Sequence, residues 1–358
     1  MSEDFVTRLG HALRVAAERE ERRGVLARRA AAARSSVPPV TSTAIGALGA
    51  LAIAVVFAVY LATTLRPEPA RPPQVIADVP LARGLGEIAS AFDSAWMVDT
   101  HEQALLRVDP ATRRVIARIP LRGQLAIAAG ADAVWVGEDA GRGASLVRID
   151  PRTNRPTARL ALRTPAGRPF PGGAVVAVGD SVWVVSAKHA LRVDARSGRV
   201  TRLATLAPPA VGVRDVTAID GDLWALRSDG RLARFDSATG ARKAIFRSSF
   251  LDMPRVVGDA RGPLLLADGN RLARIDPATG RAIWTADVAH VGPAAMANGL
   301  LWMAALDRDG ERVVAIDPRD GRIASSAHVG QHDSVSIARV AREVWLAGSS
   351  GDVLVVRP

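Results

Sequence analysis

Two histidines and two carboxylates stand where a reactive site could form. His290 and His332 lie in successive loops between repeated units of the chain, and Asp215 and Asp333 lie in loops of the same kind. If these groups converge, an imidazole beside a carboxylate can act as a general base or hold a metal ion. No phosphate-binding glycine loop, zinc-ligand spacing or Ser-His-Asp order accompanies them. The sequence therefore predicts no catalytic residue, no metal site and no cofactor, with convergence of the histidines as the open alternative.

A second set of acids repeats along the chain, and it favours turns over metal binding. The clearest copy, residues 272–281, reads Leu-Ala-Arg-Ile-Asp-Pro-Ala-Thr-Gly-Arg. Pro277 presets a type I turn, the carboxylate of Asp276 caps it, and Gly280 supplies the positive φ that closes it. No partner carboxylates stand nearby at ligand spacing. The repeated acids are Asp109, Asp150, Asp194, Asp236, Asp276 and Asp317, spaced 40 to 44 residues apart.

An apolar run centred on tryptophan precedes most of these turns. In the fifth copy Leu265 takes the place of the tryptophan. Because each run reads as a buried strand, the indole rings are expected to pack between repeated units and not to stack on a ligand. The tryptophans are Trp96, Trp135, Trp183, Trp224, Trp302 and Trp345.

The repeat predicts the fold. A period of about 40 to 45 residues with four strands in each unit is typical of a β-propeller blade. Seven copies can be counted, and the chain ends before the last copy reaches its final strand. Residues 75–81 match residues 115–121, the final strand of copy one, so the missing strand stands before the first copy. We therefore predict an all-β, seven-bladed β-propeller of four-stranded blades over residues 74–358, in which the strand 74–81 completes blade 7.

In such a ring, the loops between blades gather on one face with the loops that join strands two and three. This is the usual binding face of a propeller, and the longest of its loops, residues 163–173, departs most from the repeat. We expect an unknown protein or small-molecule ligand to dock there. The predicted ligand-binding residues are Arg122, Arg168, Phe170, Arg214, Asp215, His290, His332 and Asp333.

The first 73 residues lack the repeat and differ from it in composition. Residues 40–65 contain no charged side chain and are long enough to cross a bilayer as a helix. A secretory signal peptide is the alternative, but its basic start and apolar core are shorter. We predict a cytoplasmic basic helical segment at 1–39, a transmembrane helix at 40–65 and a Pro-rich linker at 66–73. Arginines cluster before the apolar segment, so the protein is expected to cross the cell membrane once, with its N-terminus inside and the propeller extracytoplasmic.

The composition limits the kinds of ligand and chemistry that can be expected of this protein. The net charge is +11, but the basic residues are scattered and only two, Lys188 and Lys243, are lysines. A nucleic-acid ligand is therefore not expected. The chain has no cysteine, so neither disulfides nor thiol chemistry can contribute.

The repeats resemble those of known bacterial proteins. Asp-Ser-Val-Trp-Val-Val at residues 180–185, followed by Leu-Arg-Val-Asp at 191–194, looks like the repeats of YVTN- and NHL-like propellers and of the virginiamycin B lyase (streptogramin lyase) group. The propeller resemblance implies an exported or receptor-attached binding module. The lyase resemblance implies magnesium-assisted opening of a cyclic peptide lactone with a histidine and acidic residues. Where the lyase repeats read Trp-Phe-Thr-Glu, this chain offers Glu138 and Asp99, and no histidine matches by motif.

The sequence thus favours a non-enzymatic binding or scaffolding module at the cell envelope. A metal-dependent lyase of the streptogramin type is one alternative. A signalling receptor whose segment 1–35 binds a cytoplasmic partner is another.

Overall fold

The computed structural model describes residues 72–358, except 131, 140–142, 248–254, 259–263 and 289. Residues 69–358 form one compact unit. The predicted segments 1–39 and 40–65, and most of the linker 66–73, lie outside the described residues. Within the part that is described, no helix has the length and apolar character needed to span a bilayer.

The described chain folds into seven four-stranded antiparallel sheets, which confirms the predicted seven-bladed propeller. Blade 1 holds β2 (Leu85–Ala91), β3 (Ser94–Asp99), β4 (Ala104–Asp109) and β5 (Arg114–Pro120); blade 2 holds β6 (Gln124–Gly130), β7 (Ala133–Asp139), β8 (Ala144–Asp150) and β9 (Arg155–Ala161). Blade 3 holds β10 (Ala174–Val178), β11 (Ser181–Val185), β12 (His189–Asp194) and β13 (Val200–Thr205); blade 4 holds β14 (Val213–Ile219), β15 (Asp222–Arg227), β16 (Arg231–Asp236) and β17 (Arg242–Arg247). Blade 5 holds β18 (Arg255–Val257), β19 (Leu264–Asp268), β20 (Arg271–Ile275) and β21 (Ala282–Asp287); blade 6 holds β22 (His290–Ala297), β23 (Leu300–Asp307), β24 (Gly310–Ile316) and β25 (Ile323–Gly330). Blade 7 holds β26 (Ser334–Val340), β27 (Glu343–Gly348), β28 (Asp352–Arg357) and the N-terminal β1 (Gln74–Pro80).

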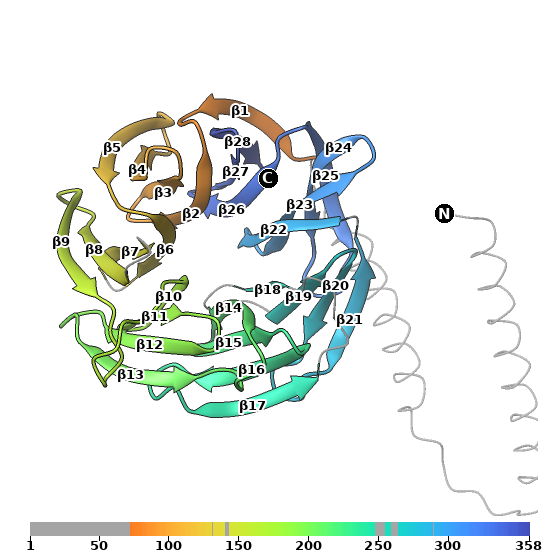
Figure 1. Ribbon diagram of the computed structural model, residues 1–358. Coiled ribbons are helices and arrows are strands. Elements are labelled where there is room, and N and C mark those ends of the chain that lie inside the picture. Colours follow the sequence, from red (N-terminus) through yellow and green to blue (C-terminus); the bar gives the residue numbers. More distant parts are fainter. Residues whose placement is uncertain (1–71, 131, 140–142, 248–254, 259–263, 289) are drawn as a thin grey trace, which may run out of the picture. The chain divides into compact units, whose positions relative to one another are not determined.

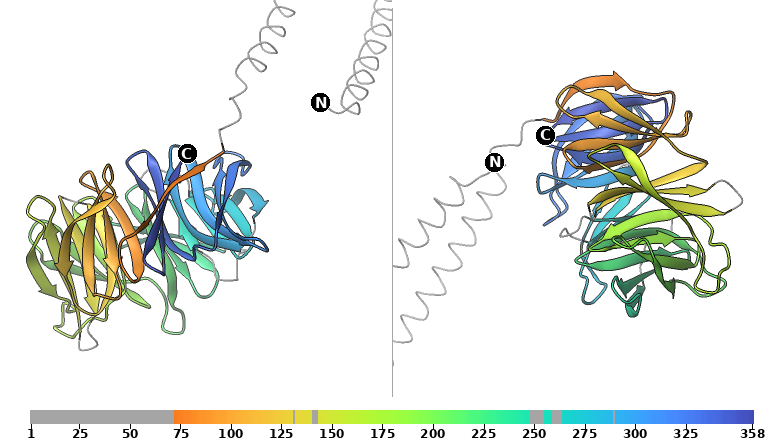
Figure 2. Two further views of the ribbon diagram at one scale, coloured as in Figure 1. Left: turned by 90° about the horizontal axis from the view of Figure 1, so that it is seen from above. Right: turned by 90° about the vertical axis from the view of Figure 1, so that its left-hand side faces the viewer.

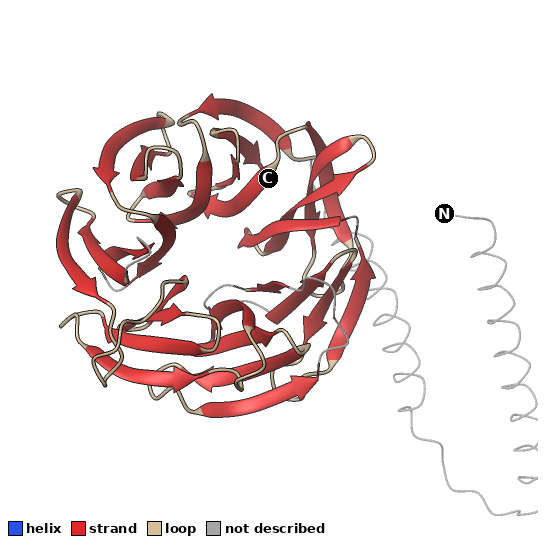
Figure 3. Ribbon diagram, viewed as in Figure 1, coloured by secondary structure: helices blue, strands red, loops and turns tan. Residues whose placement is uncertain are grey.

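The blades surround a central opening (Figure 1), and the described part of the chain consists of strands joined by loops (Figure 3). The first strand of each blade lies nearest the centre and the fourth strand lies outside. In blade 7 the outer strand is β1, which pairs antiparallel with β28 from Gln74 opposite Arg357 to Pro80 opposite Asp352. The first and last strands of the ring therefore share one sheet, and the alternating apolar residues of β1 cover an edge that would otherwise template aggregation.

The core lies between the blades. Trp96 packs between blades 1 and 2, and Trp345 packs between blades 7 and 1, each with 1% or less of its surface exposed. The other repeat tryptophans occupy equivalent places, and Leu265 fills the site between blades 5 and 6. A single blade cannot bury both faces of its sheet, so each indole stabilises a contact between two repeats.

The repeated aspartates make the contacts of turn caps. Asp276 Oδ1 accepts the Ala278 N–H at 2.9 Å, Asp276 Oδ2 accepts the Thr279 hydroxyl at 2.7 Å, and Gly280 has φ +70°. These hydrogen bonds favour the carboxylate and lower the pKa of Asp276. In the first two copies, Arg113 and Asn154 occupy the glycine position and hold positive φ values of 57°.

The propeller has two unlike faces. The loops that join strands two and three, and those that join one blade to the next, form the loop face. The turns that join strands one and two, and strands three and four, form the turn face. β28 leaves the loop at 349–351 and ends on the turn face at Arg357, so Gln74 opposite Arg357 also lies there. The chain therefore enters the propeller on the turn face, beside the C-terminus (Figure 2).

Candidate functional site

Two carboxylates from opposite parts of the ring lie near the central opening on the side of the loop face. Glu87 of β2 accepts the Ile127 N–H of blade 2 at 2.9 Å. Asp215 of β14 accepts the Val256 N–H of blade 5 at 2.8 Å, and its own neighbour Val216 donates to its other oxygen at 2.9 Å. Each acid thus joins the first strand of its blade to the first strand of the next.

The environment of these acids disfavours their charge. The surrounding protein desolvates both carboxylates and raises the pKa of Glu87 and of Asp215. The negative charge of Asp215 raises the pKa of Glu87 further, whereas the Ile127 N–H opposes the shift. The cation of Arg255 and two backbone N–H groups oppose the shift at Asp215. Glu87 keeps exposed surface at the opening, although the surrounding ring partly desolvates its carboxylate.

Small apolar side chains line the rest of the opening. A cavity of about 590 Å³ lies along the first strands of blades 1 to 4, between residues such as Ala89, Ala128, Val176 and Thr217. It continues toward the turn face, where Gly221 and Gly258 border it. The opening is therefore lined by small side chains, with polar groups toward the loop face. Such an arrangement can hold a ligand in a fixed orientation.

The predicted loop-face residues divide into exposed and buried groups. Arg122, Arg168 and Arg214 are exposed, as a docking surface requires. The prediction for Phe170 is wrong: its ring is 3% exposed and packs in the core between blades 2 and 3. The N–H of Phe170 donates to the Leu162 carbonyl at 2.9 Å, so this residue anchors the long loop and cannot receive a ligand.

His332 is buried as well, which corrects its predicted place on the binding face. Its imidazole is 2% exposed, with Nε2 3.0 Å from Asp352 Oδ2 and Nδ1 2.8 Å from Ser334 Oγ. These contacts hold the crossing from blade 6 to blade 7 against β28. Asp333, next to it, is exposed and accepts the Ser349 hydroxyl. His290 begins β22, but its side chain is not among those described, so the predicted approach of the two histidines stays a prediction.

The acids at the lyase-like positions are both engaged inside their blades. Asp99 has no exposed surface, binds Arg118 at 2.6 Å and accepts the N–H groups of His101 and Glu102. Glu138 is 3% exposed, binds Arg159, and accepts the Arg122 N–H at 3.0 Å. Each acid therefore ties the end of strand two to strand four or to the next loop.

No group of three or more His, Cys, Asp or Glu side chains able to hold a metal ion occurs among the residues that the structure describes. The acids near the opening and His332 each have protein partners. In these described residues, the chemistry on the loop face is that of hydrogen-bond donors and acceptors and exposed guanidinium groups.

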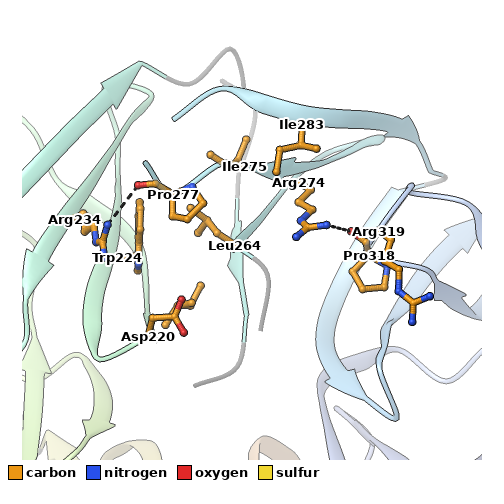
Figure 4. Close-up of a pocket in the computed structure, with 11 residues that line it drawn as sticks. Asp220, Trp224, Arg234, Leu264, Arg274, Ile275, Pro277, Ile283, Pro318 and Arg319 are labelled. Atoms are coloured by element: carbon orange, nitrogen blue, oxygen red, sulfur yellow. Dashed lines mark hydrogen bonds between the residues drawn. The ribbon is translucent and has the colours of Figure 1, made fainter. Parts of the chain in front are cut away.

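A separate groove opens on the turn face between blades 4, 5 and 6 (Figure 4). It has a volume of about 330 Å³ and an apolar floor that includes Ile275 and Leu264. The guanidinium of Arg234 lies over the Trp224 ring, 5.3 Å from its centroid, and Arg274 reaches the carbonyl of Pro318 at 3.4 Å. Sequence reasoning did not identify this groove, because it forms between repeats and no single copy contains it.

Glu87 was also missed, although the sequence holds a signal for it. The residue nine positions before the repeat tryptophan is Ala126 in blade 2 and Ser336 in blade 7, whereas blade 1 has Glu87 and blade 4 has Asp215. A comparison of the copies position by position would have marked both acids as departures from the repeat.

Comparisons with known proteins agree with this architecture. Residues 248–358 match a family model described as outer membrane protein assembly factor BamB. BamB from Moraxella catarrhalis is similar in structure, with a TM-score of 0.54 and 14% identity over 80% of this chain and 100% of that one. Virginiamycin B lyase from Staphylococcus aureus is similar with a TM-score of 0.63 and 14% identity, over 80% of this chain and 99% of that one. No curated protein sequence matches the chain. The resemblance to bacterial propeller repeat proteins of the virginiamycin B lyase-like group is confirmed, and at this identity it establishes the fold.

Proposed function

We propose that this protein is a membrane-anchored, extracytoplasmic propeller that acts as a non-enzymatic binding or scaffolding module at the cell envelope. The uncharged segment 40–65 supplies the anchor, and the arginines before it orient the chain with the propeller outside. The match of the last blades to a model described as an outer membrane protein assembly factor supports a role in the envelope.

The state of the two lyase-position acids is the observation that favours binding over elimination chemistry. Asp99 and Glu138 are 0% and 3% exposed, and each is bound to an arginine of its own blade. A carboxylate in an ion pair of this kind would have to leave its partner before it could hold a magnesium ion or accept a proton from a substrate. Since each carboxylate is buried, leaving its arginine would leave a buried charge without a partner, which disfavours that step.

The ligand is proposed to dock on the loop face. Arg122, Arg168 and Arg214 are exposed on loops of that face, and Arg214 directly precedes Asp215 in the chain. Exposed guanidinium groups on this face suit a partner with acidic or carbonyl groups, because a guanidinium donates several hydrogen bonds in a fixed plane.

The placement of the propeller is tested by cysteine labelling, for which a chain without native cysteine is well suited. Two single-cysteine variants are compared. Ala166→Cys places the thiol on an exposed loop of the propeller, and Ser2→Cys places it near the N-terminus. With a membrane-impermeant maleimide in intact cells, with the outer membrane permeabilised where one is present, we expect labelling at residue 166 and not at residue 2 until the cells are lysed. Labelling at residue 2 alone would reverse the proposed topology, and labelling at neither would place the propeller inside.

Lyase activity remains the second candidate, because the structure of virginiamycin B lyase has the same fold over 80% of this chain. Calorimetric titration of the full-length protein with magnesium tests it. Stoichiometric binding that is lost in Asp99→Asn and Glu138→Gln, with opening of a cyclic peptide lactone, would favour the lyase. If the protein neither binds magnesium nor opens the lactone, the binding module is favoured.

A further inference from the structure

The turn face carries a surface that the proposed binding role does not use. The outer strands of blades 5, 6, 7 and 1 each have a large exposed apolar side chain among their first three residues, close to the turn. Their exposed fractions are 54% for Ile283, 57% for Ile323, 41% for Val75 and 52% for Ile116. All four side chains lie at the turn-face ends of outer strands, so a flat surface that approached this part of the turn face would meet them together.

Arginines accompany these apolar residues. Arg281, Arg322 and Arg114 are the residues that lead into or begin β21, β25 and β5, and all three are exposed. The side chain of Arg322 is 87% exposed, and its Nε lies 3.5 Å from the carboxylate of Asp320, whose side chain is 50% exposed. We call Val75, Arg114, Ile116, Arg281, Ile283, Arg322 and Ile323 the basic–apolar rim.

The rim covers only part of the ring. Blades 2 and 3 also have exposed arginines where their outer strands start, Arg155 and Arg199, but two residues further on they have Thr157 and Thr201. Blade 4 has Arg242 followed by Lys243, which is bound to Asp222 and Asp236. The four blades of the rim are consecutive, and blade 7 in their midst is the blade through which the N-terminal chain enters.

The position of the rim limits what can lie against it. The eight-residue, Pro-rich linker 66–73 separates the apolar segment from β1. Extended as polyproline II at about 3.1 Å per residue, it reaches roughly 25 Å. β1 starts on the turn face, so an anchor in a bilayer holds that face, and blade 7 first, close to the membrane surface.

We propose that the basic–apolar rim rests on the membrane and binds the phosphate groups of acidic phospholipids; this rests on the proposed membrane anchor. Guanidinium groups bind phosphate in a bidentate manner, and isoleucine side chains beside them enter the boundary between headgroups and acyl chains. The aspartates of the same turns accept hydrogen bonds from their own backbone, as Asp276 and Asp317 do. The negative charges of these aspartates offset much of the positive charge of the turns. The attraction to the membrane therefore comes from short-range guanidinium–phosphate contacts and from the apolar residues.

The groove between blades 4, 5 and 6 lies next to the rim. Ile283 belongs to both, and Arg274 and Arg319 are among the residues that line the groove, with their guanidinium groups pointing in different directions (Figure 4). The Arg319 side chain is 86% exposed, and its Nε lies 3.9 Å from Asp317 Oδ1.

The test uses the full-length protein in vesicles of phosphatidylcholine, with or without phosphatidylglycerol, that carry a nitroxide on a headgroup. A fluorophore is placed at Ala278→Cys, in the turn before β21, or at Ala166→Cys, on the loop face. We expect the nitroxide to quench the label at residue 278 in vesicles with phosphatidylglycerol, and to quench it less in phosphatidylcholine alone. The label at residue 166 should be unaffected by lipid composition.

Matched triple variants separate the rim from charge in general. Arg114→Gln/Arg281→Gln/Arg322→Gln should weaken the contact roughly fivefold for each guanidinium removed. Arg155→Gln/Arg199→Gln/Arg242→Gln removes the same charge from the other arc and should leave the contact unchanged. Equal loss in both triples, or equal quenching at residues 278 and 166, would overturn the rim. Release of the full-length protein from vesicles by alkaline carbonate would instead overturn the anchor, and with it the arrangement on which the rim depends.

Discussion

Removing β1 should open the ring. We compare a chain that begins at residue 72 with one that begins at residue 82. β1 forms six residue pairs with β28, and Ile76, Ala77 and Leu81 pack against the core between blades 7 and 1. The hydrogen bonds contribute about 1 kcal/mol each and the apolar contacts about 3–4 kcal/mol in all, while ordering the strand costs about 1 kcal/mol per residue. The net loss is about 2 kcal/mol, or roughly 3–4 °C in Tm for a domain of this size.

Loss of β1 should also change the association state. β28 would become an edge strand in which Val353, Leu354, Val355 and Val356, now 4% exposed or less, have no outer partner. An uncovered apolar edge templates pairing between molecules. Calorimetry and light scattering measure both effects. A peptide of residues 74–81 should restore the Tm and the monomer, whereas the same peptide with Val79→Pro should not. If the chain from residue 82 melts like the longer chain and stays monomeric, strand closure does not stabilise this ring.

Three further changes have defined outcomes. Trp345→Ala empties a site that is 1% exposed between blades 7 and 1, and it should cost about 3–5 kcal/mol in denaturant unfolding. Gly280→Ala should lower the Tm more than Gly221→Ala; both glycines have positive φ, but a Cβ at 280 would lie 2.2 Å from the Phe246 ring whereas one at 221 meets nothing within 4 Å. Glu87→Gln should raise the Tm at pH 7, because the raised pKa of Glu87 means that the folded state disfavours its charge. The gain should shrink as the pH falls from the raised pKa toward the ordinary pKa of a glutamate, and it should be absent below that value, which thermal unfolding across this pH range measures.

The fold was predictable because the same physical problem is solved seven times. A tryptophan as the third residue of strand two and an aspartate at or just after the end of strand three recur with little change, and both have local causes in burial and turn geometry. Ring closure could be predicted because residues 75–81 repeat the apolar alternation of residues 115–121. Leu265 shows that the pattern tolerates a smaller side chain where the next blade fills the space.

The site was less predictable, because membership of a loop does not determine where a side chain points. Phe170 lies in the longest loop and yet is buried, since an eleven-residue loop needs its own apolar anchor. His332 lies in a polar segment, but its imidazole is buried against Asp352 at the start of β28, twenty residues further along the chain. Asp99 and Glu138 bind arginines of strand four. Those pairings depend on the register between strands and not on spacing along the chain.

The position of β1 connects the two proposals. A strand borrowed from the N-terminus to complete blade 7 has to run antiparallel to β28, so it begins where β28 ends, on the turn face. An anchor placed before it therefore cannot hold the loop face toward the bilayer without turning the propeller against a linker of eight residues. With the proposed anchor in place, the way this ring closes would assign its faces: the turn face with Arg114, Arg281 and Arg322 would lie toward the lipid, and the loop face with Arg122, Arg168 and Arg214 would lie open to a partner. Substitutions in the first set should change how the propeller sits on the membrane, and substitutions in the second should change what it binds.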